Sequence, residues 1–264
     1  MKPIGIFDSG IGGLTVAREI RRLLPNESTI YVGDTARVPY GSKDPQTLLE
    51  YGRDIIRFLL SKNVKAVVLA CGTSSANTFD KLKEEFPNIL LIDVLRPGVA
   101  ACLDIVKEKP TTRFGLIATA ATIKSGFFQK NFNNAATLYS VACPLFASMV
   151  EAGMAVKPNN LILKFVAETY LMHLKGKMDA LVLGCTHYPL LVDTLSDVLG
   201  DVKFINLADS TANALKDALI LNGLLADGNA TPVHEFYVSG SAEVFRLAAC
   251  EIFNEECSPV GVKW

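Results

Sequence analysis

Short apolar runs alternate along the chain with longer amphipathic stretches. Runs rich in Val, Ile and Leu are typical of buried strands, and apolar residues spaced by three and four predict helices. We expect strands at residues 4–7, 29–32, 66–70, 89–93, 114–118, 137–141, 180–184, 202–205 and 235–238. We expect helices at residues 14–24, 47–60, 77–85, 98–107, 161–174, 189–199, 212–221 and 242–253. Strands that alternate with helices form βαβ units, so the pattern predicts an α/β fold with mostly parallel sheets.

Nine strands are many for one sheet in a chain of 264 residues, and two smaller doubly wound sheets fit the length better. A weak internal repeat supports two halves. Residues 67–73 and 181–186 each read as an apolar strand that ends in a small residue, followed by a cysteine and a nearby threonine. Asp8 and Thr119 come at the ends of two further strands, 63 and 66 residues before these cysteines. The sequence therefore predicts two related halves.

Two places along the chain are candidate domain boundaries, although no Ser/Gly-rich linker marks them. The first lies at residues 96–98, where Pro97 biases Arg96 away from helix and Gly98 allows a bend. The second lies at residues 207–209.

Composition and charge narrow the class of protein. The formal net charge is −1, and the chain has no basic cluster, so we expect no contact with nucleic acid or with a membrane surface. The N-terminus lacks a signal-peptide core, and no uncharged apolar run approaches the ~18 residues of a membrane span, which predicts a cytoplasmic protein. The six cysteines lie far apart and are expected to be free thiols. Only three scattered histidines are present, so no metal site is expected.

Cys71 and Cys185 are the candidate catalytic residues. Both follow predicted buried strands, and open α/β sheets bind ligands outside the carboxyl ends of their strands. Each also precedes an expected helix start, where free N–H groups and the helix dipole lower the pKa of a thiol. A free cysteine can instead be a small core residue, but two cysteines at equivalent strand ends favour a functional pair.

A pair of thiols suits proton transfer at carbon, because the reference pKa of a thiol, about 8.5, lies close to neutrality. Racemisation needs a base on one face of Cα and an acid on the other. One thiolate and one thiol supply both, and they exchange roles in the reverse direction. Two facing domains would place them on opposite faces of the substrate. The competing interpretations are a thiol redox protein and a binding protein that has lost catalysis.

The glycine-rich loop at residues 8–13 follows the first strand and opens a helix. The dinucleotide pattern Gly-x-Gly-x-x-Gly fails because position 15 is Thr. An acidic residue directly before the glycines would also repel phosphate. We therefore interpret the loop as a tight turn that presents Asp8 to an ammonium group, and Ser9 with backbone N–H groups to a carboxylate.

Two further polar segments follow strands. His187 lies two residues after Cys185, and we assign it an assisting role in proton transfer. Residues 33–43 form a long polar loop, which is either a solvated connection or part of the site. In the second case Arg37 and Lys43 would attract a dicarboxylate. The sequence leaves both interpretations open.

These segments together resemble the glutamate racemase family. The matching stretches occur in the family's order at residues 5–10, 33–37, 39–41, 70–71, 150–153 and 183–190. The resemblance implies two pseudo-symmetric flavodoxin-like domains with the active site between them: residues 1–97 with 208–264, and residues 98–207. It also implies interconversion of L- and D-glutamate without a cofactor, for peptidoglycan synthesis. A homodimer is expected from the family alone.

The resemblance also implies a role for each matching residue. Cys71 would take the α-proton from D-glutamate and Cys185 from L-glutamate. Asp8 would assist the first cysteine and His187 the second, with Glu151 as a further acidic residue near His187. The substrate would be bound by Asp8, Ser9, Pro39, Tyr40, Gly41, Gly72, Thr73, Thr119, Thr122, Thr186 and His187.

One departure from the family concerns Gly72. Family members usually read Cys-Asn-Thr where this chain reads Cys-Gly-Thr. The asparagine amide would bind the substrate, and losing one such hydrogen bond costs about 1–3 kcal/mol. We therefore expect retained chemistry with weaker or altered binding of glutamate. Another amino acid, such as aspartate, is the alternative substrate.

Overall fold

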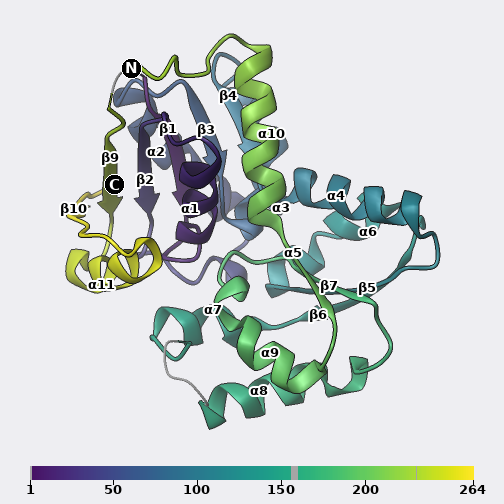
Figure 1. Ribbon diagram of the computed structural model, residues 1–264. Coiled ribbons are helices and arrows are strands. Elements are labelled where there is room, and N and C mark those ends of the chain that lie inside the picture. The colour runs from purple at the N-terminus through teal and green to yellow at the C-terminus, as the bar shows by residue number, and fades with distance from the viewer. Residues whose placement is uncertain (1, 156–159, 230) are drawn as a thin grey trace.

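Two parallel β-sheets organise the chain in the computed structural model, which describes residues 2–155, 160–229 and 231–264 (Figure 1). The strands are β1 Ile4–Asp8, β2 Thr29–Gly33, β3 Ala66–Leu69, β4 Leu90–Asp93, β5 Arg113–Ala118, β6 Thr137–Ala142, β7 Ala180–Leu183, β8 Lys203–Asn206, β9 His234–Val238 and β10 Val260–Gly261. The six-stranded sheet has the order β10-β9-β2-β1-β3-β4, and the four-stranded sheet has the order β6-β5-β7-β8. Each pairing between these strands is parallel.

The two sheets share one internal strand order. The run β2-β1-β3-β4 of the first corresponds to the run β6-β5-β7-β8 of the second. In each run the chain winds outward in both directions from its first strand, which makes the sheet doubly wound. Ligands of such sheets bind at the carboxyl ends of the strands beside this reversal, here β1 with β3 and β5 with β7. The predicted α/β class with two pseudo-symmetric, mostly parallel sheets is confirmed.

Helices cover both faces of each sheet. They are α1 Leu14–Leu23, α2 Pro45–Ser61, α3 Gly72–Glu85, α4 Leu95–Glu108, α5 Ala120–Lys124, α6 Phe127–Phe132, α7 Pro144–Glu151, α8 Leu161–Leu171, α9 Val192–Leu199, α10 Leu207–Leu221 and α11 Ala242–Phe253, with short 3-10 helices η1 Tyr40–Ser42, η2 Met172–Leu174 and η3 Tyr188–Leu191. Helices α2 and α3 pack on one face of the six-stranded sheet, and α1, α10 and α11 pack on the other. Figure 1 shows α4 and α6 above the four-stranded sheet, with α8 and α9 below it. None of the helices in the described ranges is long and apolar enough to span a bilayer.

The apolar cores explain why the strands read as continuous hydrophobic runs. In β1, Phe7 packs with the side chains of α2 and α3, whereas Ile4 and Ile6 face the opposite cluster. That second cluster continues through Leu95 and Leu207 into the four-stranded sheet. Each fully buried apolar side chain contributes about 1.5–3 kcal/mol. The shared cluster therefore joins the two halves through apolar packing.

The helix expected at residues 98–107 starts earlier than the sequence indicates. It begins at Leu95, so the prediction that Pro97 keeps Arg96 out of a helix is wrong. Pro97 is the third residue of α4, where backbone N–H groups have no helical partner, so proline loses no hydrogen bond there. The Asp93 carboxylate accepts from the N–H groups of Leu95 and Arg96 at 2.8 and 2.9 Å. A side-chain cap thus overrides the local preference.

The short helices α5, α6 and α7 and the edge strand β10 are not predicted by the sequence pattern. The longest of these has eight residues, too few for helical periodicity to be evident. Local signals were present in two cases: Thr119 caps α5 through its side chain, and Pro144 occupies the first turn of α7. The omission matters because α7 ends at Glu151.

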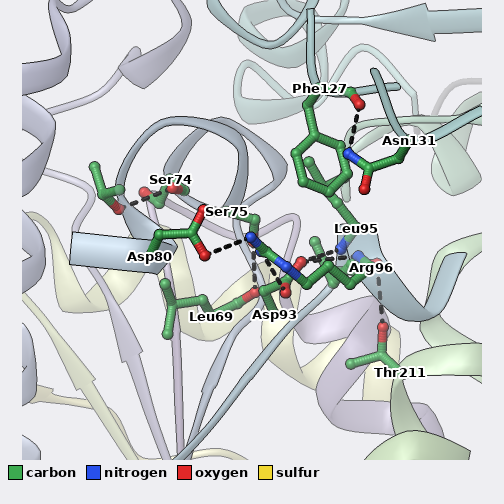
Figure 2. A network of polar contacts seen from close by, with 12 residues as sticks. Leu69, Ser74, Ser75, Asp80, Asp93, Leu95, Arg96, Phe127, Asn131 and Thr211 are labelled. Carbon is green, nitrogen blue, oxygen red and sulfur yellow. Dashed lines mark hydrogen bonds and ion pairs between the residues drawn. The ribbon is translucent and has the colours of Figure 1, made fainter. Parts of the chain in front are cut away.

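A polar network at the start of α4 links elements of the two halves (Figure 2). The Arg96 guanidinium donates to Asp93 at 3.0 Å and to Asp80 at 2.6 Å. It also lies 4.4 Å from the ring centre of Phe79 on α3 and 5.3 Å from that of Phe127 on α6. Each such cation–π contact contributes about 0.5–1 kcal/mol at a partly exposed position. One side chain therefore ties α3 of the first sheet to a helix that flanks the second.

Candidate active site

The two candidate cysteines occupy equivalent positions in the two sheets and line one cavity of about 260 Å³. Each cysteine follows its strand after one small residue: Cys71 follows β3 after Ala70, and Cys185 follows β7 after Gly184. Both are buried, with 4% and 7% of their surface exposed. Cys71 occupies the N-cap position of α3, which starts five residues earlier than expected, and Cys185 precedes a turn and the 3-10 helix η3, which continues into α9. Each cysteine therefore precedes a helix start, as expected, although only Cys71 lies directly at the start of an α-helix.

Most residues that the sequence analysis selected line this cavity: Ser9, Pro39, Tyr40, Gly41, Cys71, Gly72, Thr73, Thr119, Glu151, Cys185, Thr186 and His187. Asp8 and Thr122 lie behind it. Asp8 accepts from the Gly10 N–H at 3.0 Å and from the Thr186 hydroxyl at 3.2 Å, and Thr122 Oγ1 lies 3.0 Å from Thr119 Oγ1. The cavity also includes side chains that the sequence analysis did not select: Val38, Ser42, Ala120, Pro144, Ala147 and Ser148.

A chain of polar contacts runs from Cys185 toward the first half. Cys185 Sγ lies 3.6 Å from Nδ1 of His187, and Nε2 of His187 lies 2.6 Å from Oε1 of Glu151. The same carboxylate oxygen accepts from the Ile11 backbone N–H at 2.9 Å. A Cβ at Gly10 would collide with this carboxylate, so the loop approaches Glu151 closely only because residue 10 is glycine. Glu151 of the second half is thus the partner of His187, and the Ile11 N–H of the first half holds Glu151 in place.

The charged forms of His187 and Glu151 stabilise each other. Burial lowers the pKa of His187, but hydrogen bonds to Cys185 and Glu151 outweigh it and raise that pKa well above its ordinary value. For Glu151 burial raises the pKa, and the hydrogen bond from His187 with its positive charge outweighs it, so the net direction is down. The pair is therefore ionised around neutral pH, which gives His187 a proton to share with Cys185.

Replacing Glu151 with glutamine should make the protein's stability depend differently on pH. The raised pKa of His187 contributes stability below its unfolded value, which is lost as pH rises through the folded pKa. The lowered pKa of Glu151 contributes stability that is lost as pH falls through its own folded pKa. We expect Glu151→Gln to cost about 1.5–3 kcal/mol near pH 6, where both charges are present. The deficit should shrink toward either extreme, as measured by urea unfolding at several pH values. A pH-independent deficit would contradict the ionised pair.

The environment of Cys71 differs from that of Cys185. Its thiol donates to Oγ of Ser9 at 3.8 Å, and it faces no cationic side chain comparable to His187 among the groups that shift its pKa. Burial, followed by the negative charge of Asp8, raises the pKa of Cys71 to about 11. Cys71 is therefore a protonated thiol at neutral pH in this structure, which suits the role of an acid.

Hydroxyl groups bridge the halves on another wall of the cavity. Thr73 Oγ1, in the first turn of α3, lies 2.8 Å from Oγ1 of Thr119, which follows β5. Both side chains are buried and line the cavity. Hydroxyl groups can both donate and accept, so this pair can reorient toward a carboxylate.

The loop that follows β2 contributes Tyr40 to the cavity, but its Arg37 is paired with carboxylates outside the cavity lining. The Arg37 guanidinium pairs with Asp34 at 2.6 Å and with Asp54 at 2.9 Å. Asp34 also accepts from the hydroxyl of Tyr40 and from the indole N–H of Trp264. Arg37 thus supports the loop from behind, and the suggestion that it attracts a dicarboxylate finds no support in its contacts.

The glycine-rich loop after β1 uses its N–H groups within the protein. The N–H of Gly10 donates to Asp8 and that of Ile11 to Glu151, while the Tyr31 hydroxyl donates to the Gly10 carbonyl at 2.8 Å. The N–H groups of this turn do donate to carboxylates, as its sequence suggested, but these are the side chains of Asp8 and Glu151. Among the described residues, no group of three or more His, Cys, Asp or Glu side chains could hold a metal ion.

Each of the two related sheets places one cysteine on a shared cavity, which is the arrangement that a racemase with two opposed thiols requires. The chain belongs to the Asp/Glu/hydantoin racemase family, whose model matches residues 4–215. A glutamate racemase from Aquifex aeolicus is 46% identical over 215 residues, which are 81% of this chain and 82% of that protein. The crystal structure of glutamate racemase from Francisella tularensis, in complex with D-glutamate, superposes with a TM-score of 0.87 at 37% identity, covering 99% of this chain and 97% of that one. A glutamate racemase isoform from Bacillus anthracis gives a TM-score of 0.90 at 35% identity, with coverage of 99% and 97%. The resemblance to glutamate racemases is confirmed.

Proposed function

We propose that this protein interconverts L- and D-glutamate by a two-base proton transfer at Cα and supplies D-glutamate for peptidoglycan synthesis. The observation that carries the proposal is the cavity that Cys71 and Cys185 share, one contributed by each half. Its volume of about 260 Å³ is below the usual range for drug-sized ligands and suits one amino acid. Relatives named glutamate racemase support glutamate as the substrate.

The proton transfers follow from the two thiol environments. With L-glutamate, the Cys185 thiolate takes the α-proton, so the Cα–H bond breaks and an S–H bond forms. The protonated Cys71, whose pKa is raised to about 11 by burial and Asp8, then delivers its proton to the opposite face of Cα. This leaves a thiol at Cys185 and a thiolate at Cys71, which is the arrangement that D-glutamate requires for the reverse reaction. No electrons or cofactor are consumed.

The remaining polar groups bind and orient the substrate. His187, held by Glu151, shares its proton with Cys185, and Asp8 assists Cys71 and attracts the substrate ammonium group from below the cavity. The carboxylates are bound by hydroxyl and N–H donors along the cavity: Ser9, Thr73, Thr119 and Thr186, with Thr122 supporting Thr119. Pro39, Tyr40, Gly41 and Gly72 complete its walls. Fixed donors of this kind stabilise the charge that develops as the α-proton leaves.

We also propose how the chain is divided into domains and where the protein acts. The first domain comprises residues 1–97 and 208–264, and the second comprises residues 98–207. This division assigns β1–β4, β9 and β10 to one domain and β5–β8 to the other. The six free cysteines suit a reducing cytoplasm. A homodimer is proposed from the family alone, and light scattering after size-exclusion chromatography would test it.

Proton exchange at Cα in D₂O, followed by NMR without added cofactor, tests the proposed function. We expect deuterium to enter both L- and D-glutamate while their optical rotation decays to zero. A panel of other amino acids, aspartate among them, should exchange at least tenfold more slowly. Exchange of aspartate in preference to glutamate would keep the chemistry and overturn the substrate. No exchange with any amino acid would overturn the proposal.

A further inference from the structure

Ser74 carries a buried hydroxyl for which the structure gives no partner. It lies in the first turn of α3, three residues after Cys71, and its exposed fraction is 0%. Among the residues that the structure describes, no hydrogen-bond partner reaches its Oγ. An unpaired buried hydroxyl costs about 1–3 kcal/mol, so the few that occur in folded proteins call for an explanation.

The neighbouring hydroxyls of α3 are all paired. Ser75 donates to the Leu69 carbonyl at 3.1 Å, and Thr78 donates to the Ser74 carbonyl at 2.8 Å. Thr73 is paired with another threonine at 2.8 Å. Figure 2 shows Ser74 and Ser75 next to each other at the start of this helix. Since Ser75 has a structural partner and Ser74 has none, the two serines form a natural comparison.

Cys71 is the group beside Ser74 that changes charge. Cys71 is the N-cap residue of α3, a position from which a side chain can accept from the N–H groups of the first turn, although its thiol forms no such bond in this structure. In the thiol form Sγ donates to Ser9 instead. A thiolate cannot donate, so it needs hydrogen-bond donors when the proton has left.

The other groups around Cys71 oppose a thiolate. Asp8 at the end of β1 and Cys185 from the second half both raise its pKa by charge, and the neutral phenols of Tyr31 and Tyr40 lie close enough to interact with it. Burial and the charge of Asp8 have the largest effects on the pKa of Cys71, and both raise it. The backbone N–H of Ser74 has the next largest effect and lowers this pKa, and the Ser74 hydroxyl also lowers it.

We propose that the Ser74 hydroxyl donates a hydrogen bond to the Cys71 thiolate and positions this cysteine as the base that acts on D-glutamate. The inference rests on the proposed function, in which Cys71 alternates between thiol and thiolate. It explains why an unpaired hydroxyl is kept in the first turn of α3: its partner forms only in one half of the catalytic cycle. Ser74 acts through Cys71, so it is a positioning residue.

The reactivity of Cys71 toward iodoacetamide tests this inference, because only the thiolate reacts. The alkylation rate of the Cys71 peptide, followed by mass spectrometry at a fixed pH of about 8.5, reports the thiolate fraction. We expect Ser74→Ala to lower this rate about tenfold, equivalent to a rise of one pH unit in the pKa of Cys71. The matched variant Ser75→Ala should leave it within twofold of the wild type.

Stability gives a second readout that separates the two roles. Alanine favours helix and removes an unpaired hydroxyl, so Ser74→Ala should melt at or above the wild-type temperature. Ser75→Ala should melt lower, because it loses a formed hydrogen bond. Racemisation by Ser74→Ala should fall about tenfold in kcat/KM in both directions equally, since the equilibrium constant between enantiomers is one.

Two results would overturn the inference: an unchanged alkylation rate in Ser74→Ala, or an equal fall in Ser75→Ala. Alkylation needs no turnover, so it can be read even if the wild type fails to exchange protons with any amino acid. In that case the proposed function fails, while a tenfold effect of Ser74→Ala on the thiol would still establish the hydrogen bond.

Discussion

Removing either cysteine should lower racemisation of glutamate about 10³-fold, within the range of 10²–10⁴ that a positioned acid or base contributes. Cys71→Ala leaves no proton donor on one face of Cα, and Cys185→Ala leaves none on the other. The substrate cavity itself should persist, because alanine retains the apolar contact of the buried side chain. Circular dichroism of the glutamate solution measures racemisation, and NMR in D₂O measures exchange.

The residual exchange distinguishes two bases from one. In Cys71→Ala any remaining deuterium uptake should be confined to L-glutamate, and in Cys185→Ala to D-glutamate, because one base faces one enantiomer. Cys102→Ala is the control, since Cys102 is buried on α4 and is not part of the cavity lining. Equal residual exchange of both enantiomers in either variant would argue against two opposed thiols.

Introducing the family's usual asparagine at Gly72 should lower kcat about 10–100-fold rather than improve the enzyme. A Cβ at this position would come within 2.6 Å of the Gly184 carbonyl oxygen, which is backbone and cannot turn aside. Gly184 directly precedes Cys185, so any displacement moves one thiol relative to the other. A misplacement of about 1 Å can cost 10²-fold in rate.

Matched glycine variants separate the steric effect from the amide. Gly72→Ala carries the same Cβ and should lose a similar factor in kcat, whereas Gly261→Ala has open space around its Cβ and should be neutral. Steady-state kinetics with both enantiomers measures the changes. A lower KM with unchanged kcat in Gly72→Asn would show that the cavity accommodates the amide and that its absence had weakened glutamate binding.

Much of the fold could be predicted because the strands are apolar throughout. A strand covered on both faces reads as an uninterrupted hydrophobic run, so its end is visible where the first polar residue or cysteine follows. Cys71 and Cys185 were selected for this reason, as was Asp8. The parallel order of each sheet then brings those strand ends together.

The partners of these residues could not be predicted in the same way. Glu151 lies at the end of the eight-residue helix α7, and only tertiary packing brings it to His187. Arg37 looked suited to a dicarboxylate, but a loop sequence does not reveal that Asp54 on α2 competes for it. That Ser74 is buried without a hydrogen-bond partner among the described residues can be recognised only once its neighbours in space are known.

The contact between Thr73 and Thr119 has a consequence for selectivity. In the structure each hydroxyl satisfies the other at 2.8 Å, across the line where the two halves meet. A ligand that draws these hydroxyls to itself gives up that bond, which is worth about 0.5–1.5 kcal/mol net, and must offer acceptors in exchange. A carboxylate does so with two oxygens, whereas an apolar side chain that separates the two threonines would leave both buried hydroxyls unpaired. The two threonines therefore select against a ligand that separates their hydroxyls without accepting from them, and they favour a ligand that accepts from both.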